Sequence, residues 1–434
     1  MSTLFEKITI LDKYGTVQPN HYVYVKDGKV AYIGKDAPLQ YADDIISGEG
    51  KLLMPAFYNA HTHSPMTLMR GYGENMKLED WLHKRVFPFE EKLDREAVYW
   101  ATMLHMAESF RSGIVSSTDM YFLCEEIVRA AVESGAKINV GRAFTSFDEN
   151  VPMREMRAFK ELDALVKLSN GAYGGRIRVE AALHAEYTST PRLVREIAEY
   201  AASEGLQMHV HVSETKAEHE ACKERHEGKT PVRYFYDAGL FDVKTTAAHG
   251  VWLEKEDIAL LAEKKVTVAS CPISNLKLAS GVCPVPELMK AGIDVALGTD
   301  SVASNNSLDI FEEMKFFSLL QKGWRGDPTL STPREVLNAA TFVGAKSQGR
   351  TDCGRIAEGY RADLIVIDLQ KPSLQPLHDL YNNLVYSASG ADVWLTMIDG
   401  KTVYHKGEFL TLDIERVYFE VNGAVARVLG MLNE

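Results

Sequence analysis

The chain has 434 residues, 46% of them hydrophobic, which suits one large packed domain with a smaller one and excludes a disordered or fibrous protein. Sixty acidic against 48 basic residues give a formal net charge of −12, and no lysine and arginine cluster marks a nucleic-acid partner. No apolar run reaches the ~18 residues that span a bilayer, and the first residues lack a signal-peptide pattern, so we expect a cytoplasmic protein without a membrane partner. Five scattered cysteines favour reduced thiols over disulfides or a thiolate zinc site.

Both ends of the chain have the texture of short strands in hairpins. Residues 1–54 alternate β-rich runs with turn signals, among them Asp27-Gly28. Residues 356–434 repeat this pattern, with Asp399-Gly400 as a further hairpin turn. We therefore predict that the two ends combine into one small β-sandwich domain.

Between these ends, residues 55–355 alternate helical patterns with short apolar runs such as "IRVEAAL", "LQMHVHV" and "DVALGTD". About eight such βα units predict an α/β fold with a closed (β/α)8 TIM barrel, whose active site lies at the carboxyl ends of the strands. An open doubly wound sheet is the alternative, but no Gly-X-Gly-X-X-Gly follows the first strand.

Polar residues end several predicted strands of the barrel. His61 and His63 are two apart and so project to the same side, although a pair of hydrogen-bonded polar residues would look alike. His209 and His211 share a face of a later strand; we favour His211 as a ligand and regard His209 as a hydrogen-bonded core group. Further along lie Glu214, His249 and Asp300.

Each of these residues also has a structural interpretation. Glu214 could be a carboxylate favoured by a helix dipole, and Asp300 could cap the helix that follows it. Together, however, such interpretations require several coincidences at one rim of the barrel. Imidazoles with a carboxylate are the ligands expected for Zn²⁺ or Fe²⁺ rather than for Mg²⁺ or Ca²⁺, so the pattern predicts a transition-metal site.

Longer motifs carry a family resemblance. "MPAFYNAHTHSPMTLMRG", "HVHVSET", "AAHGVWL", "GTDSVASNNSLDIFEEM" and "GRIAEGYRADLIVID" resemble the amidohydrolase superfamily over nearly the whole chain. Within it, the sequence is most similar to deaminases of methylthioadenosine and S-adenosylhomocysteine. Triazine hydrolases and guanine-type deaminases share a similar pattern.

The resemblance implies a ligand set of His61, His63, His211 and Asp300 around one divalent ion, with zinc expected and iron as the alternative. Binuclear relatives carry a carboxylated lysine at the end of the fourth strand, where this chain has His184. That difference supports a single ion.

The implied activity is hydrolytic deamination of adenosine-type nucleosides, a hydrolase reaction on C–N bonds of cyclic amidines that releases ammonia. A divalent ion lowers the pKa of its bound water to about 7, so hydroxide is available to attack the ring carbon. Glu214 would shuttle protons, Asp300 would take the proton of the water, and His249 would stabilise the developing charge. A hydrolase of guanine, pterin or triazine type is the alternative; a metal-free scaffold predicts gaps in the ligand set, and the sequence has none.

The resemblance also suggests substrate contacts. Trp81 would line the purine pocket, although an aromatic residue can simply anchor a helix. Glu90 would bind ribose hydroxyls, its neighbour Glu91 being the alternative, and His184 would bind a ring nitrogen unless it is structural. Ser304 and Glu214 complete the expected set.

One segment departs from the family pattern. Relatives that act on S-adenosylhomocysteine hold its carboxylate with arginines, as bidentate geometry favours, but Phe147 and Phe159 occupy the matching positions here. Arg154 and Arg157 lie nearby and would replace them only if the loop shifts. We therefore expect adenosine, 5′-deoxyadenosine or 5′-methylthioadenosine to be preferred. Separately, we expect the enzyme to be a homo-oligomer.

Overall fold

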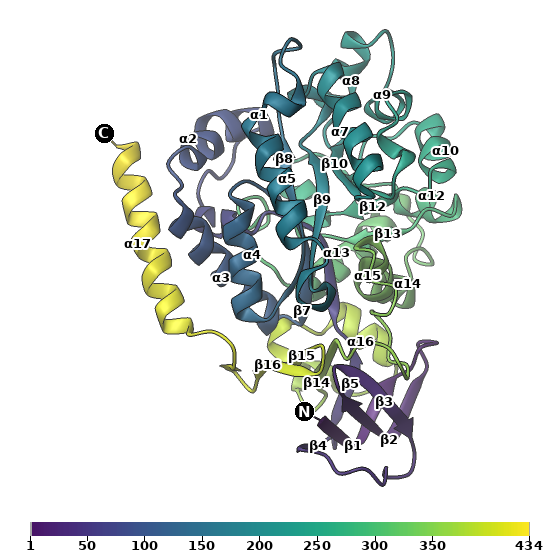
Figure 1. The fold of residues 1–434 in the computed structure, drawn as a ribbon. Helices are drawn as coiled ribbons and strands as arrows, with labels where there is room; N and C mark the ends of the chain where they lie inside the picture. Colours follow the sequence, from purple (N-terminus) through teal and green to yellow (C-terminus); the bar gives the residue numbers. More distant parts are fainter. Residues whose placement is uncertain (1, 434) are drawn as a thin grey trace.

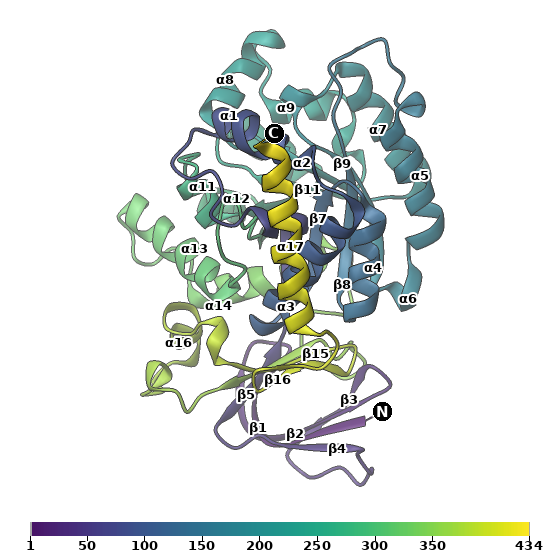
Figure 2. The same cartoon turned by 90° about the vertical axis from the view of Figure 1, so that its left-hand side faces the viewer.

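The computed structural model describes residues 2–433 and shows a barrel of parallel strands wrapped by helices, with a separate sheet below it (Figures 1 and 2). All eight barrel strands pair in chain order, which confirms the predicted α/β barrel. Every residue of the first two strands is buried, as expected for strands that helices cover on the outside. The strands are β6 (Phe57–Thr62), β7 (Ile114–Tyr121), β8 (Lys137–Phe144), β9 (Ile177–Leu183), β10 (Met208–Val212), β11 (Thr245–His249), β12 (Thr267–Ser270) and β13 (Val295–Leu297).

The first and last strands, β6 and β13, meet at a seam that nearly closes the barrel. The ladder pairing runs from β13 to β6 around the other strands. Across the seam, the backbone N–H of Asp300 donates to the carbonyl of His61 at 2.9 Å. Beside it, the Asn59 amide donates to the Thr299 hydroxyl at 2.7 Å. These bonds bring His61 and Asp300 together although 239 positions separate them in the chain.

Helices surround the barrel, and several begin with the side-chain caps that their sequences predict. Asp94 caps α3 by accepting from the Ala97 N–H, and Thr215 forms a capping box with Glu218 at the start of α8. The helices are α1 (Leu78–Trp81), α2 (Phe87–Glu90), α3 (Arg95–Arg111), α4 (Cys124–Ser134), α5 (Arg157–Ser169), α6 (Ala172–Gly175), α7 (Pro191–Glu204), α8 (Lys216–Arg225), α9 (Pro231–Asp237), α10 (Lys255–Glu263), α11 (Pro272–Lys277), α12 (Val285–Lys290), α13 (Ile310–Arg325), α14 (Pro333–Asn338) and α15 (Gly344–Ser347).

Strands from both ends of the chain combine, as predicted, and they form one mixed sheet. Its small core takes buried residues from both ends, such as Phe5 and Val366. Lys137 of β8, itself buried, forms ion pairs with Asp363 and Asp399, which fasten the sheet to the barrel. The strands are β1 (Ser2–Leu11), β2 (Val17–Lys26), β3 (Lys29–Gly34), β4 (Asp44–Ser47), β5 (Lys51–Pro55), β14 (Leu364–Asp368), β15 (Val393–Ile398), β16 (Lys401–His405) and β17 (Glu408–Phe409).

The last segment of the chain leaves the sheet and returns to the barrel. Helix α16 (Leu380–Tyr386) precedes β15, and helix α17 (Ile414–Leu432) packs against α3 (Figure 2). We retain divisions near residues 54 and 355 as proposed domain boundaries. Within residues 2–433, no helix has both the length and the apolar character needed to cross a membrane.

Candidate metal centre and active site

Three histidines converge at the carboxyl end of the barrel strands. His61 is the penultimate residue of β6, His63 directly follows that strand, and His211 is the penultimate residue of β10. Each of them offers a ring nitrogen, and these atoms all lie within 4.8 Å of one another. Such spacing suits imidazoles that share one transition-metal ion. The Nε2 atom of His61 is buried and lacks a hydrogen-bond partner, as expected for a nitrogen reserved for an ion.

The protonation of these rings also suits metal binding. Burial lowers the pKa of His61 to about 3 and that of His211 well below its usual range, so both rings are neutral near pH 7. Burial also lowers the pKa of His63, but its contact with Asp300 outweighs burial and raises that pKa to about 9. An ion that binds His63 would therefore displace a proton.

Asp300 completes the group from the other side of the seam. Its Oδ1 lies 3.3 Å from His63 Nε2 and 3.6 Å from His61 Nε2. The hydroxyls of Ser274 and Ser304 donate to its other oxygen at 2.5 and 2.9 Å. These bonds fix the orientation of the carboxylate, so that Oδ1 faces the histidines.

Glu214 and His249 lie beside the three histidines and face each other. Glu214 is buried, and its Oε2 lies 3.7 Å from His249 Nε2. Ser280 donates to the other oxygen of Glu214 at 3.1 Å, and the Asn275 amide lies 2.9 Å from His249 Nδ1. Burial raises the pKa of Glu214, which suits a group that must carry a proton at neutral pH.

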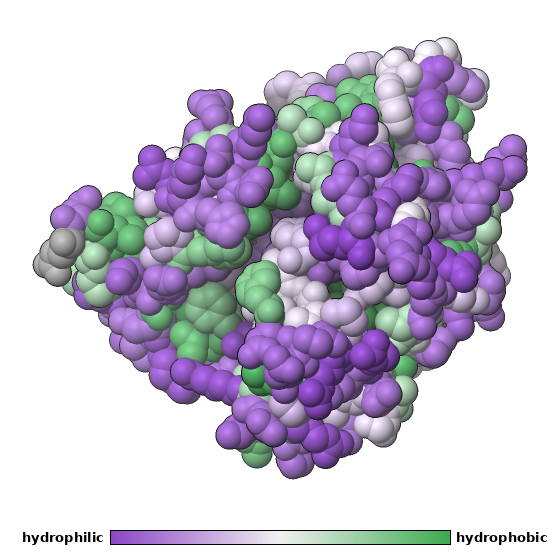
Figure 3. Space-filling view, turned by 90° about the horizontal axis from the view of Figure 1, so that it is seen from above, coloured by the Kyte–Doolittle hydropathy of each residue, from purple (hydrophilic) through white to green (hydrophobic). Residues whose placement is uncertain are grey.

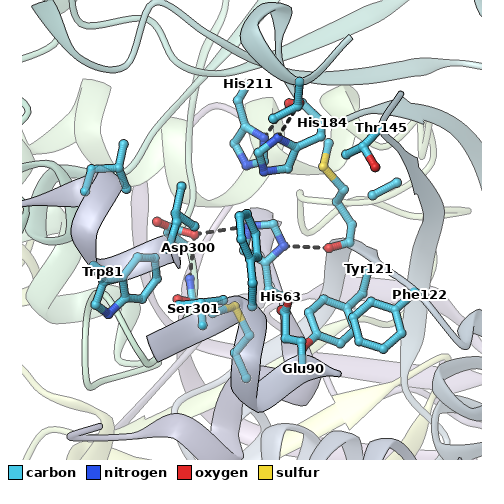
Figure 4. A pocket seen from close by; sticks show the side chains of 18 of the residues that line it. His63, Trp81, Glu90, Tyr121, Phe122, Thr145, His184, His211, Asp300 and Ser301 are labelled. Atoms are coloured by element: carbon cyan, nitrogen blue, oxygen red, sulfur yellow. Dashed lines mark hydrogen bonds and ion pairs between the residues drawn. The ribbon is translucent and has the colours of Figure 1, made fainter. Parts of the chain in front are cut away.

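A cavity of about 480 Å³ opens over these residues and has the size of a small-molecule site. Seen from above, this face of the molecule is hollowed, and residues of intermediate to hydrophobic character (white to green) lie in the hollow within a mostly hydrophilic (purple) surface (Figure 3). Trp81 of α1, Glu90 of α2 and His184 after β9 line the cavity, as do His63 and Asp300 (Figure 4).

These lining residues differ in their local environment. Burial raises the pKa of Glu90 to about 7. Burial lowers the pKa of His184 to about 4, and its Nδ1 lies 2.8 Å from the Thr188 hydroxyl, which orients the ring. Ser304 is fully buried behind Asp300, and Ser301 stands in the cavity lining at that point.

The mouth of the cavity carries an exposed aromatic side chain, and the arginines near it already contact other residues. Phe147 lines the mouth and is 82% exposed. Arg142 is the sole arginine or lysine among the described lining residues, and its Nε lies 2.7 Å from Glu161. Arg157 pairs with the same Glu161 at 2.7 Å, and Arg154 lies over the Phe159 ring, outside the described lining.

A second group of metal-ligand types lies outside this cavity floor. Ligand atoms of Glu186, Cys222 and His226 also lie within 4.8 Å of one another. The buried Glu186 is already paired with Arg225, and its Oε1 lies 2.7 Å from His226 Nε2. These pairings account for the cluster, so we assign it a structural role.

Sequence reasoning missed the residues that position the reactive groups. Asn275 and Ser280 follow β12, yet they sit in a short helix and loop without the pattern of a polar strand end. His209 is a buried, hydrogen-bonded core group, as expected, and its Nε2 lies 2.8 Å from Nδ1 of His61. That its partner would be a ligand histidine was not predicted.

Comparisons with known proteins agree with this arrangement. A model of the amidohydrolase family matches residues 52–403. A 5-methylthioadenosine/S-adenosylhomocysteine deaminase from Caldanaerobacter subterraneus subsp. tengcongensis is 43% identical over 401 residues, covering 92% of each chain. A 5′-deoxyadenosine deaminase from Methanosarcina acetivorans is 39% identical over 415 residues, covering 95% of each chain.

Solved structures are also similar to this chain over nearly its whole length. An adenosine deaminase from Xanthomonas campestris with bound zinc has a TM-score of 0.93 at 30% identity, covering 99% of this chain and 98% of that one. An atrazine chlorohydrolase from Arthrobacter aurescens complexed with zinc shares the fold, with a TM-score of 0.90 at 20% identity, covering 98% and 100%. Because the family model spans most of the sequence and its relatives align over nearly their full length, this chain belongs to the amidohydrolase family.

Proposed function

We propose that the protein is a metal-dependent deaminase of adenosine-type nucleosides, which hydrolyses the ring C–N bond and releases ammonia. The observation that carries this proposal is the placement of the buried Glu214 beside three histidines that suit one ion. Relatives named for the deamination of 5-methylthioadenosine, S-adenosylhomocysteine and 5′-deoxyadenosine support the substrate class.

The histidines and Asp300 fit a single Zn²⁺, with Fe²⁺ as the alternative, because both ions accept nitrogen and carboxylate ligands. When bound, such an ion supplies the Lewis acidity that makes water nucleophilic at neutral pH. Zinc in the solved adenosine deaminase supports the first choice.

The residues around this centre would divide the proton transfers. Asp300 accepts the proton of the attacking water, because its carboxylate is held facing the histidines. Glu214, whose raised pKa lets it carry a proton, delivers that proton to the ring nitrogen, then takes the proton of the newly added hydroxyl and passes it to the departing amine, which leaves as ammonia. The proton held by Asp300 returns to Glu214 and resets the site. His249, held by Asn275, lies close enough to Glu214 to stabilise charge that develops between them.

The cavity would orient the nucleoside along its length. Trp81 gives a face for the purine, and His184 offers the ring nitrogen not occupied by Thr188. Glu90 accepts from ribose hydroxyls as a carboxylate. Ser304 would contribute through Asp300, to which it donates.

The mouth argues for a small or apolar 5′ group. An amino acid carboxylate is best held by a free arginine fork, whereas Arg142 and Arg157 both direct their Nε atoms to the carboxylate of Glu161. Phe147 instead offers an apolar surface. We propose that adenosine, 5′-deoxyadenosine and 5′-methylthioadenosine are better substrates than S-adenosylhomocysteine.

An ammonia-release screen tests both levels of the proposal. It should include these four nucleosides together with guanine, cytosine and a triazine. We expect turnover of the three short nucleosides. Release from guanine or triazine alone would overturn the adenosine assignment, and turnover of S-adenosylhomocysteine without the short nucleosides would overturn the preference at the mouth. The expected homo-oligomer and cytoplasmic location stay predictions.

A further inference from the structure

The three ligand histidines differ in what holds their second ring nitrogen. Nδ1 of His63 lies 2.5 Å from the Met120 carbonyl, and Nδ1 of His211 lies 2.6 Å from the His184 carbonyl. A carbonyl can only accept, so in both rings a proton sits on Nδ1, which leaves Nε2 as the nitrogen that can bind an ion. His61 has no such carbonyl among its recorded partners.

Nδ1 of His61 lies instead 2.8 Å from Nε2 of His209, which can either accept or donate. The tautomer of His61 therefore depends on the tautomer of His209. Both rings are buried, and their planes are nearly parallel, at 15°.

Behind His209 lies a buried carboxylate. Oε2 of Glu180 is 3.8 Å from Nδ1 of His209, and both atoms are buried without a hydrogen-bond partner. The other oxygen of Glu180 accepts from Asn139 at 2.6 Å and from Gln207 at 3.0 Å. Nε2 of His61 also lacks a hydrogen-bond partner, so each of the three residues from Glu180 through His209 to His61 has one buried atom without a hydrogen bond.

We propose that Glu180 and His209 are positioning residues that hold His61 in the tautomer required for metal binding. The inference rests on the proposed metal site. An ion on Nε2 of His61 requires the proton on Nδ1, which donates to Nε2 of His209. The proton of His209 then sits on Nδ1 and faces the carboxylate of Glu180, whose Oε2 lies 3.8 Å away and favours a proton there electrostatically.

The opposite arrangement of protons is unfavourable in this setting. If Nε2 of His209 donated to His61, the proton of His61 would move to Nε2 and block the ion. The bare Nδ1 of His209 would then face a carboxylate oxygen, so two acceptors would meet in a buried space. Glu180 thus favours the metal-binding tautomer of His61 by acting through His209.

The substitution Glu180→Gln tests this relay with little change in shape. The new amide oxygen can still accept from Asn139 and Gln207, which turns the amide nitrogen toward Nδ1 of His209. That nitrogen donates, so His209 adopts the opposite tautomer and His61 is protonated on Nε2. We expect the dissociation constant of Zn²⁺ to rise about 10–100-fold, as for other residues that orient a ligand.

The measurement is competition for Zn²⁺ between the apoprotein and a chromophoric chelator. His209→Leu should show a similar loss, and Glu180→Gln should add nothing in that background, because it acts through His209. His209→Gln offers an amide oxygen to His61 directly. It should restore an affinity close to that of the wild type and remove the sensitivity to Glu180→Gln.

His105→Leu is the matched control. His105 of α3 is equally buried, but its Nε2 lies 3.4 Å from the hydroxyl of Ser117 of β7, apart from the ligands. Its Zn²⁺ affinity should equal that of the wild type. Wild-type protein without stoichiometric Zn²⁺ or Fe²⁺ binding would refute the proposed function itself. Two results would overturn the relay alone, with Zn²⁺ binding by the wild type intact. One is a Zn²⁺ dissociation constant of Glu180→Gln within twofold of the wild type. The other is a double variant with His209→Leu in which the two losses of affinity add. Should His209→Leu fail to fold, the comparison of Glu180→Gln in the wild type and in His209→Gln decides.

Discussion

At the inner end of the cavity, His61 and His211 are buried, His63 is half-buried, and each ring is held by a second group. At the mouth, by contrast, Phe147 is 82% exposed. The inner residues come from strand ends, which the barrel places accurately. The mouth is built from loops between β8 and α5, which no ladder fixes. This difference teaches that the chemistry depends on the barrel, while the choice among nucleosides depends on loop residues.

The largest expected effect comes from breaking the inner end. His211→Ala removes one of three converging nitrogens and leaves its partners without a complete site. We expect a loss of Zn²⁺ affinity greater than the ~100-fold that an outer partner costs, with turnover lost in parallel. Elemental analysis and ammonia release measure the two losses. Retention of stoichiometric metal would contradict the ligand assignment.

Glu214→Gln should separate chemistry from metal binding. The amide keeps the shape of the side chain but cannot shuttle protons, so kcat should fall by roughly 10²–10⁴ while the metal content stays unchanged. Steady-state ammonia release and elemental analysis check this. The control is Ser280→Ala, which removes only a hydrogen bond to Glu214 and should cost less. Full activity of Glu214→Gln would remove the proton-shuttle role.

The pH dependence of kcat/KM should show an effect of intermediate size, which we attribute to Glu90 at the proposed ribose end of the cavity. Burial raises the pKa of Glu90 to about 7, so the carboxylate form is lost as the pH falls through that value. Since the role proposed for Glu90 is to accept from ribose hydroxyls as a carboxylate, kcat/KM for 5′-methylthioadenosine should fall up to about tenfold per pH unit below pH 7. Glu90→Gln should lack this limb of the profile. An unchanged limb would assign it to another group.

The smallest effects should come from the mouth. Phe147→Arg places an unpaired cation there, and we expect kcat/KM for S-adenosylhomocysteine to rise about tenfold, the value of one exposed charged hydrogen bond. Activity on 5′-deoxyadenosine serves as the control and should change little, since it has no carboxylate. An equal change for both substrates would show that Phe147 does not select the 5′ group.

The sequence predicted the inner end well, because a repeating strand pattern determines where a strand stops. Five residues of the inner end lie within the last two positions of a strand or just after one, and parallel strands of a barrel end at one rim: His61, His63, His211, His249 and Asp300. The contacts among their outer partners were not predictable. The meeting of Glu180 with His209 depends on the stagger between β9 and β10, which a single strand pattern does not contain.

Helix α17 shows a second limit. Its buried residues Val417, Val421, Ala424 and Val428 follow a helical spacing. Valines and the two glycines of this segment have low helix propensity, so the local signal favoured strands. Packing against α3 stabilises the helix, and that contact is not visible in the local sequence.

The seam between β6 and β13 has a thermodynamic consequence. His61 belongs to the first strand of the barrel and Asp300 follows the last, so an ion held by both would act as a clasp on the ring. Closing the barrel at this seam therefore also brings together the residues that would hold the ion. Ion uptake would therefore stabilise the whole barrel by mass action, and its withdrawal would loosen the protein first along this one line.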